Sequence, residues 1–299
     1  MMLNRVTNLT MTATAQRNLQ NQQSRLAELQ VKASTLDKIS RPSDDPSATG
    51  EALQTRARQA ANEQYGRNID DGGSWLNATD SALGQATNVL NKIRDLTVQS
   101  GNGALNQTAR DAIAIELDGL GQDLLSIANT QHLGRNIFAG SSDAAGAFTP
   151  GAAGSAPTYN GIPGGTVERR ISDNQTVRID VDGAKIFGDG ATSVFTLVGG
   201  LAAALRTGAD VTPKLTDVDA AFKAVVSGRA EIGSRQAQLE RAGNVNTELE
   251  NTLDAQRMGI EKLDLGSVIL DLKLQETNYQ VALAATARVL QPSLMDFLR

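Results

Sequence analysis

The chain contains no cysteine, which excludes disulfide bonds and cysteine-based metal sites. His132 is the only histidine, and its predicted place at a helix end favours a capping or surface role over a catalytic one. Aromatic residues make up only 3% of the 299 residues. This shortage argues against one large compact globule and favours long helices that pack along narrow stripes of Leu, Ile, Val and Ala.

No part of the chain is rich in basic residues alone. The net charge is −5, and acidic and basic side chains are mixed along the sequence. Because nucleic-acid binding needs a basic surface that neutralises phosphates, we do not expect it. The strongest apolar run, residues 194–205, is too short to span a bilayer, so we expect a buried strand–helix piece there and no membrane insertion. The N-terminal residues lack the continuous apolar core of a secretory signal.

Motifs for catalysis or ligand binding are also missing. The sequence DVDG at 180–183 resembles the start of a calcium-binding loop, but the glycine and glutamate positions of that loop hold Lys185 and Ala191. The chain has no Gly-Lys-Ser/Thr phosphate-binding motif. We therefore predict no catalytic, cofactor-binding or metal-binding residues, and a protein that is not an enzyme.

The two ends of the chain carry apolar residues at heptad spacing, the pattern of paired long helices. The N-terminal stripe consists of Leu19, Leu26, Leu29, Ala33 and Leu36. A C-terminal series keeps one phase in multiples of seven, interrupted by Asn246 and Ser267, at Val225, Ile232, Leu239, Leu253, Ile260, Leu274 and Val281, with Leu270 at a companion position. This predicts one very long helix, or two collinear helices with a joint near 264–266. Antiparallel pairing of the two ends would cover both stripes.

The sequence RPSDDP separates the first helical segment from the next. The residue before a proline is disfavoured in a helix, so the first helix is predicted to end at Arg41 and Pro42. Asp45 before Pro46 fits an N-cap followed by proline at the first helical position. We predict a rigid joint between two helices, formed by Arg41, Pro42, Ser43, Asp44, Asp45 and Pro46.

The middle of the chain changes from helical to β-rich. Helices are predicted over 46–100, with a soft point at Asp70-Asp71-Gly72-Gly73, and again after the turn at 101–106. Their apolar stripes contain Leu76, Leu83, Ala86, Leu90 and Ile93, and then Ile113, Leu117, Leu120, Leu124 and Ile127. Residues 139–165 are rich in Gly, Pro, Ala and Ser, and 166–187 carries alternating β-branched residues around Asp173-Asn174, which predicts a hairpin.

These patterns predict a mainly α fold with a small β insertion. Long antiparallel terminal helices are followed by a helical-bundle core and a β-rich outer domain. The expected limits are residues 1–41 with 264–299 for the terminal helices, 42–140 with 197–263 for the bundle, and 141–196 for the β-rich domain.

The apolar stripes of the two terminal segments contain few residues. Five apolar side chains do little to offset the entropy lost when the N-terminal helix becomes ordered. The C-terminal segment also has apolar residues off its main stripe, and a helix that is apolar on more than one side needs more than one partner: Leu265, Ile269, Leu272, Leu283 and Leu290. We therefore expect the ends to become ordered only on assembly with other subunits.

Four segments resemble the bacterial flagellin superfamily: ISRPSDDPSATGEAL at 39–53, the helical run at 68–102 that ends IRDLTVQSGN, GRNIFAGS at 134–141, and NYQVALAATARVLQPSLMDFLR at 278–299. They resemble hook–filament junction proteins more than filament flagellin. Pro42 and Pro46 lie in a segment that is typically alanine-rich in flagellin. The C-terminal sequence LQPSLMDFL also differs from the usual C-terminal sequence of flagellin.

The resemblance implies a structural adaptor that forms a ring between hook and filament and is required for filament attachment and motility. Its expected partners are further copies of itself, the other hook-associated junction protein, the flagellin filament and, inside the cell, an export chaperone. It would reach the extracellular flagellum through the flagellar type III export system. The terminal helices would form an inner tube, in which we expect Leu19, Leu26, Leu29, Leu36, Leu270, Leu274, Val281 and Leu290 to pack.

Three other functions are considered. Filament flagellin would form long filaments from this protein alone. A cytoplasmic coiled-coil scaffold would be found inside cells and be absent from sheared flagella. An enzyme hidden in the β insertion would lose an activity when residues 139–190 are removed.

Overall fold

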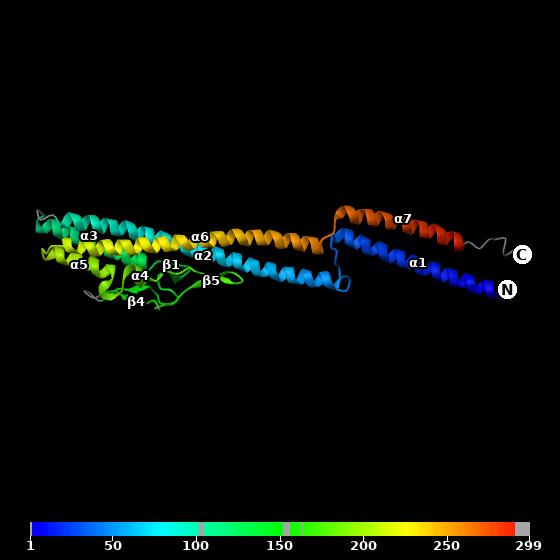
Figure 1. Cartoon of the computed structure of the whole chain (residues 1–299), viewed down its shortest axis with the longest axis horizontal. Helices are drawn as coiled ribbons and strands as arrows, with labels where there is room; N and C mark the ends of the chain where they lie inside the picture. The colour runs from blue at the N-terminus through cyan, green and yellow to red at the C-terminus, as the bar shows by residue number, and fades with distance from the viewer. Residues whose placement is uncertain (1, 102–104, 152–155, 163, 291–299) are drawn as a thin grey trace. The chain divides into compact units, whose positions relative to one another are not determined.

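The computed structural model describes residues 2–101, 105–151, 156–162 and 164–290 (Figure 1). The chain divides into two compact units. Unit 1 consists of Met1–Ala61 and Glu250–Arg299, and unit 2 of Asn62–Leu249. Two long helices, α2 (Pro46–Ser100) and α6 (Leu215–Glu261), contribute residues to both. Among the described residues, no helix is long and apolar enough to cross a membrane.

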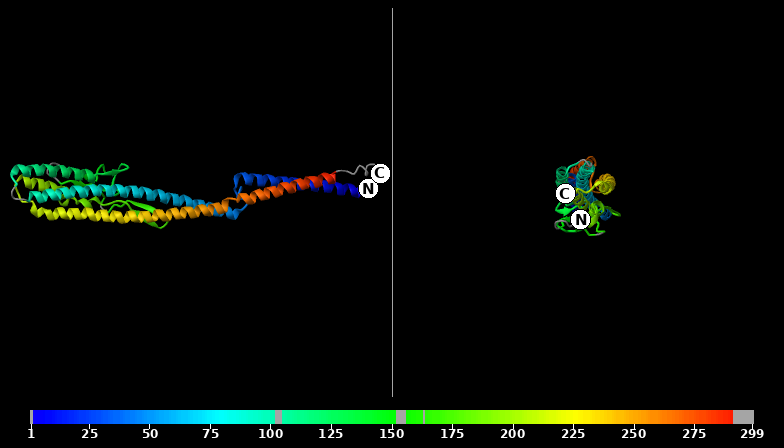
Figure 2. Two further views of the ribbon diagram at one scale, coloured as in Figure 1. Left: turned by 90° about the horizontal axis from the view of Figure 1, so that it is seen from above. Right: turned by 90° about the vertical axis from the view of Figure 1, so that its left-hand side faces the viewer.

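Unit 1 contains a pair of antiparallel helices from the two ends of the chain. These are α1 (Met2–Thr35) and α7 (Leu265–Leu290), which lie side by side in Figures 1 and 2. The predicted alternative of two C-terminal helices is confirmed, because α6 ends at Glu261 and α7 begins at Leu265. The predicted antiparallel pairing of the ends is confirmed as well.

Unit 2 is built on α2 and α6, against which α3 (Gln107–Ala128) and α5 (Val194–Arg206) pack. The apolar stripes predicted for α2 and α3 are confirmed, since all ten of their residues are buried. The apolar run at 194–205 forms α5, with six of its residues buried. The run is therefore a helix throughout, and the strand part expected for it is not formed.

Among the described residues of unit 2, short strands form three antiparallel pairs. They are β1 (Gln131–His132) with β2 (Arg135–Asn136), β3 (Phe148–Thr149) with β4 (Thr158–Tyr159), and β5 (Glu168–Ser172) with β6 (Gln175–Arg178). The last pair confirms the hairpin predicted around Asp173-Asn174. Short helical turns complete the unit: α4 (Gly183–Phe187), η1 (Gly190–Thr192) and η2 (Thr212–Lys214).

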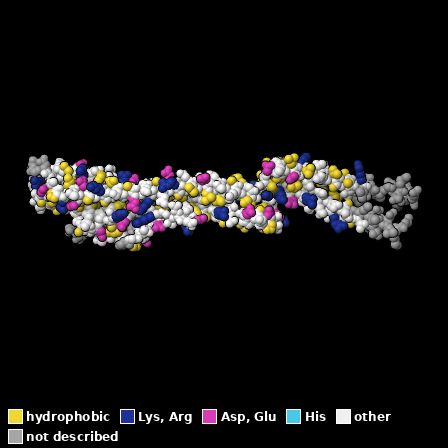
Figure 3. All heavy atoms as spheres, viewed as in Figure 1, with side chains coloured by type: hydrophobic (Ala, Val, Ile, Leu, Met, Phe, Trp, Pro, Cys, Tyr) yellow, Lys and Arg dark blue, Asp and Glu magenta, His cyan; other side chains and the backbone are white. Residues whose placement is uncertain are grey.

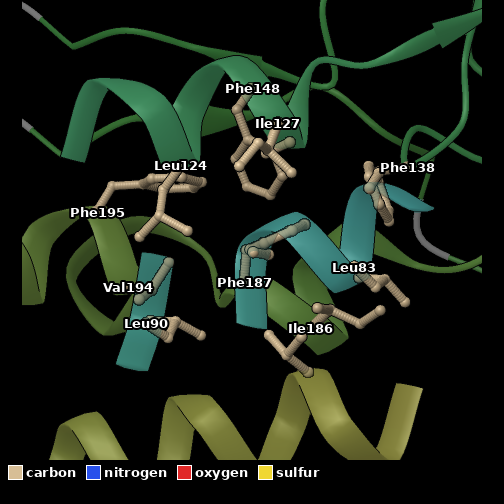
Figure 4. Packing of buried hydrophobic residues seen from close by; sticks show 14 of the residues in the cluster. Leu83, Leu90, Leu124, Ile127, Phe138, Phe148, Ile186, Phe187, Val194 and Phe195 are labelled. Carbon is tan, nitrogen blue, oxygen red and sulfur yellow. The ribbon is translucent and has the colours of Figure 1, made fainter. Parts of the chain in front are cut away.

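The β region and the helices of unit 2 share one hydrophobic core (Figure 4). Phe138, Phe148, Phe187 and Phe195 pack ring to ring, and Phe148 lies 5.0 Å from Phe195 and 6.0 Å from Phe187 between ring centroids. Leu83 and Leu90 of α2 and Leu124 of α3 reach the same cluster. The structure thus gathers the predicted β-rich domain and most of the bundle into one compact unit, and the three-domain division with its limits stays a prediction.

The soft point predicted at 70–73 is wrong, because α2 continues through it. Gly72 is buried, and a Cβ atom there would lie 3.2 Å from both Ile179 Cγ2 and Leu239 Cδ1. The neighbouring Asp71 pairs with Arg169 of β5 at 2.6 Å. The glycine therefore allows the β region and α6 to approach α2 closely, and it does not interrupt the helix.

Candidate assembly surface and joint

One side of α7 packs against α1. Val268 is 3% exposed, and the side chains that follow on the same side are partly buried. We call this side the facing stripe: Val268, Leu272, Gln275, Tyr279, Ala282 and Thr286. On α1 the partly buried positions include Ala15 and the predicted Leu19, Leu26 and Leu29, with Leu36 directly after the helix. The structure therefore brings the four predicted N-terminal leucines together in this pair.

The other side of α7 is apolar and exposed. Leu270, Leu274 and Val281, which we call the outward stripe, are 73%, 65% and 63% exposed. Each is two residues from a member of the facing stripe, and two residues turn about 200° around a helix. Leu265, Ile269 and Leu283 are further exposed side chains of α7, and Figure 3 shows hydrophobic side chains along this segment. Exposed apolar side chains that recur along one side of a helix, as in the outward stripe, mark an interaction site.

The prediction that one heptad phase continues through the C-terminal region is wrong beyond Ile260. Val225, Ile232, Leu239 and Leu253 are buried, whereas Leu274 and Val281 of the same series are exposed. Residues 262–264 are not helical, so the positions in α7 do not continue the helical phase of α6. Asp264 then starts α7 by accepting a hydrogen bond from the Ser267 backbone N–H at 3.1 Å. Leu290 is the last residue of α7, and its side chain lies outside the described ones.

A polar contact lies in the middle of the α1–α7 pair. Gln275 Nε2 donates to the Gln22 backbone carbonyl at 3.3 Å and also to Gln22 Oε1. Both glutamines are partly buried. Gln22 follows Leu19 and precedes Leu26, and Gln275 follows Leu272 and precedes Tyr279. One amide pair therefore takes the place of an apolar pair in this stripe.

The first helix ends at Thr35, so the predicted end at Arg41 and Pro42 is wrong. The predicted joint residues form a closed turn followed by a helix cap. The Arg41 N–H donates to Asp44 Oδ2, and the Asp44 N–H donates to the Arg41 carbonyl, both at 2.9 Å. The Ala48 N–H donates to Asp45 Oδ1 at 2.9 Å, and α2 begins at Pro46. The N-cap predicted for Asp45 is confirmed. Pro42 and Ser43 complete the turn and are exposed.

The two linkers of unit 1 are tied to each other beside this joint. The Lys38 N–H donates to the Glu261 carbonyl at 2.7 Å, and the Leu263 N–H donates to the Leu36 carbonyl at 2.9 Å, so that Asp37 and Lys262 form an isolated antiparallel bridge. Leu36 adopts a positive φ of 57°, a conformation that is unfavourable for leucine.

Side chains reinforce this bridge. Lys262 Nζ lies 2.7 Å from Asp37 Oδ1, and Arg56 Nε lies 2.7 Å from Glu261 Oε1. The hydrogen bond with Glu261 raises the pKa of Arg56. Except for Glu261, which is 16% exposed, the side chains in these pairs are 45–61% exposed, and each pair contributes little to stability. Sequence reasoning missed them and the Gln22–Gln275 pair, because charged and amide residues are common and their spacing carries no pattern that points across 225 or 253 positions.

The described residues contain no group of three or more His, Cys, Asp or Glu side chains that could hold a metal ion. His132 lies in β1 and packs edge-on against Trp75, with 5.7 Å between ring centroids.

Comparison with known proteins gives long matches. The flagellar hook-associated protein 3 of Salmonella typhimurium is 26% identical over 288 residues, which cover 88% of this chain and 89% of that protein. The flagellar filament 30.7 kDa core protein of Treponema maltophilum is 26% identical over 89% of this chain and 90% of its own length. The structure of a putative flagellar hook-associated protein from Vibrio parahaemolyticus has the same fold, with a TM-score of 0.67, 22% identity and coverage of 73% of this chain and 99% of that one.

Two family models also match. The bacterial flagellin N-terminal helical region matches residues 6–143, and the bacterial flagellin C-terminal helical region matches residues 215–298. These ranges contain α2, α3, α6 and α7 and all of α1 after its first four residues, the elements that build the assembly surface, the joint and the bundle. The chain belongs to the bacterial flagellin superfamily.

Proposed function

We propose that this protein is a structural adaptor of the bacterial flagellum, which assembles at the hook–filament junction and connects the hook to the flagellin filament. The outward stripe carries this proposal. Leu270, Leu274 and Val281 keep 63–73% of their surface exposed on a helix that already has one partner. A second apolar side of this kind is completed by another protein, and subunits of a tube supply such partners to one another.

The sites follow from the same geometry. The α1–α7 pair is the assembly module, in which Leu19, Leu26, Leu29 and Leu36 hold the pair together and the outward stripe contacts other subunits. The turn and cap of residues 41–46 act as the joint between this module and the bundle. We assign Leu290 to the same module on the resemblance of residues 278–299.

The partners are proposed on the family resemblance. They are further copies of this chain in a ring, the other hook-associated junction protein, the flagellin filament and an export chaperone inside the cell. The protein reaches the extracellular flagellum through the type III export system, and it acts without nucleic acid or membrane insertion. It is a structural protein and not an enzyme. This rests on its resemblance, over most of its length, to a hook-associated protein and a filament core protein.

A filament subunit is the second candidate, because a filament core protein also matches over 89% of this chain. The junction role is preferred on the proline-containing joint and the C-terminal ending. The test removes the gene. Cells should then make hooks but release their flagellin into the medium, and a plasmid copy should restore attached filaments. Filaments that stay attached would contradict the junction role, whereas hooks with no flagellin in the cells or the medium would favour the filament subunit.

A further inference from the structure

Leu133 lies in an unfavourable position at the end of the β1–β2 hairpin. Leu133 and Gly134 alone form the turn, and both have a positive φ, of 50° and 79°. A two-residue turn of this kind favours Asn, Asp or Gly, because other side chains clash with the backbone at positive φ. Leu133 is also 82% exposed, the largest value among the exposed large apolar side chains of the described residues. Neither backbone preference nor packing within the chain accounts for a leucine here, and such an outlier points to a function.

The hairpin holds the Leu133 side chain in a fixed place. Before the turn, His132 packs edge-on against Trp75 of α2, with 5.7 Å between ring centroids. After the turn, Asn136 is 3% exposed, and its Nδ2 donates to the Ala144 carbonyl at 2.5 Å. Both strands are therefore anchored to unit 2, and the turn between them presents one leucine to the solvent.

One charge of each sign lies beside this leucine. Arg135 Nη2 is 3.8 Å from Asp143 Oδ1, and the two side chains are 42% and 93% exposed. A pair at this distance and exposure contributes little to stability, so both charges are available to another molecule. We call Leu133, Arg135 and Asp143 the hairpin tip.

A groove elsewhere in unit 2 has matching properties. On α6 it is lined by Val245 and Leu249, which are 64% and 45% exposed. Its other side is formed by α2 and the end of the β5–β6 hairpin, where Tyr65 Oη donates to Asp173 Oδ1 at 2.8 Å. Asp173 and Arg241 are exposed charged residues of the same groove, so each charge of the hairpin tip has a counterpart of opposite sign. We call this groove the α6 groove.

Leu133 does not enter the α6 groove of its own chain, since most of its surface is exposed. The β1–β2 hairpin packs at Trp75, whereas Tyr65 of the groove lies ten residues earlier on α2, about 15 Å along the helix. We propose that the hairpin tip of one copy docks in the α6 groove of a second copy, with Leu133 on Val245 and Leu249.

The two surfaces are different, so each copy offers one tip and one groove. The contact can therefore repeat from copy to copy, which a ring requires and a symmetric dimer does not. This inference rests on the proposed function for the assembly in which the contact forms, whereas the match between tip and groove is a property of the chain itself.

Leu133→Asn separates a role in assembly from a role in folding. Asn tolerates positive φ, so the midpoint of thermal unfolding of the purified full chain should stay the same or rise. The amount of this chain retained in flagella purified from cells should fall about tenfold, because a buried leucine contact is lost. Ile162→Asn, at a 53% exposed position outside both surfaces, is the matched control and should leave retention unchanged. Normal retention of the Leu133 variant would overturn the proposal.

Cysteine cross-linking tests the pairing itself, because the chain has no cysteine of its own. Flagella that contain a variant with Leu133→Cys and Leu249→Cys are purified and oxidised gently. We expect a ladder of dimers and larger multimers, since every copy carries both surfaces. A variant with Leu133→Cys and Ile162→Cys is the control and should give no ladder.

The outcomes distinguish the docking from the proposed function. Retention in flagella without a ladder, or a cross-link to a different flagellar protein, would overturn the docking and leave the proposed function standing. Absence of the parent chain from flagella would contradict the proposed function. The purified double-cysteine chain, oxidised at high concentration, then decides on the docking: a ladder supports it, and single chains alone overturn it.

Discussion

Unit 2 buries most of its large apolar side chains in one shared core, whereas unit 1 fully buries few of its own. In unit 2 the core includes residues of α2, α3, α5, α6 and the strands. Among the described residues of unit 1, the buried apolar side chains are only Ala52, Leu253 and Val268. The exposed ones include Leu270, Leu274 and Val281. Unit 2 therefore forms its hydrophobic core within one chain. Unit 1 leaves exposed apolar side chains that another protein chain could bury.

The distribution of phenylalanine shows the same contrast. Four of the six phenylalanines of the chain pack together in unit 2, where their large rings fill a closed core. The α1–α7 pair is held by one stripe of Leu, Val and Ala with an amide pair inside it. Changes in unit 2 should therefore affect the stability of a single chain, and changes in the outward stripe should affect assembly.

The largest effect is expected for Leu274→Asp. Assembly would bury the new carboxylate in an apolar contact, at a cost of several kcal/mol in each subunit. Cells that carry this variant should lose attached filaments, whereas the thermal unfolding of unit 2 in the purified chain should not change.

Gln280→Glu is the matched control for this variant. Gln280 is exposed on the same helix and lies about 100° around it from either stripe, so the added charge should leave attachment normal. Attached filaments in cells with Leu274→Asp would show that the outward stripe is not an assembly surface.

Phe148→Ala should have the next largest effect and the opposite pattern. Removing a ring that contacts Phe187, Phe195 and Tyr159 should lower the free energy of unfolding of unit 2 by about 3–5 kcal/mol. Urea denaturation followed by tryptophan fluorescence measures this loss, since Trp75 lies in the same core. A change below about 1 kcal/mol would mean that the aromatic cluster contributes little packing energy.

Asp45→Ala should have the smallest effect. Loss of the cap on the Ala48 N–H should destabilise the start of α2 by about 1 kcal/mol. Hydrogen exchange of the amides at 47–49 should become faster, while exchange in α3 stays unchanged. Ser43→Ala, at an exposed position in the same turn, is the control. Unchanged exchange in the Asp45 variant would mean that the turn at 41–44 alone fixes the joint.

The sequence predicted those parts of the fold in which local pattern and packing agree. The stripes of α2 and α3, the cap at Asp45 and the hairpin at Asp173-Asn174 each have a physical signal within a few residues. The amide pair and the linker bridge have none, because their partners are brought together only by the fold. Gln, Asp and Lys are common on protein surfaces, so the residue types at Gln22, Gln275, Asp37 and Lys262 do not point to these contacts.

Two errors have the same origin. The heptad series from Val225 onward counts through Lys262–Asp264 as if these residues were helical. Residue spacing alone does not reveal that α6 ends before them. The glycines at 72 and 73 predict a weak point of the helix, although Gly72 lies in close contact with Ile179 and Leu239. In both cases the deciding fact is a three-dimensional neighbour that lies far away in the sequence.

We propose that the terminal pair is held by few contacts in a single chain and is completed by other copies. Hydrogen exchange of the purified single chain and of flagellar assemblies tests it directly, with α1 and α7 compared with α2 and α3. We expect weak protection of 13–35 and 265–288 in the single chain, strong protection of 75–96 and 113–128, and a large gain in the terminal helices on assembly. Terminal helices as protected as α3 in the single chain, with no gain on assembly, would contradict the claim.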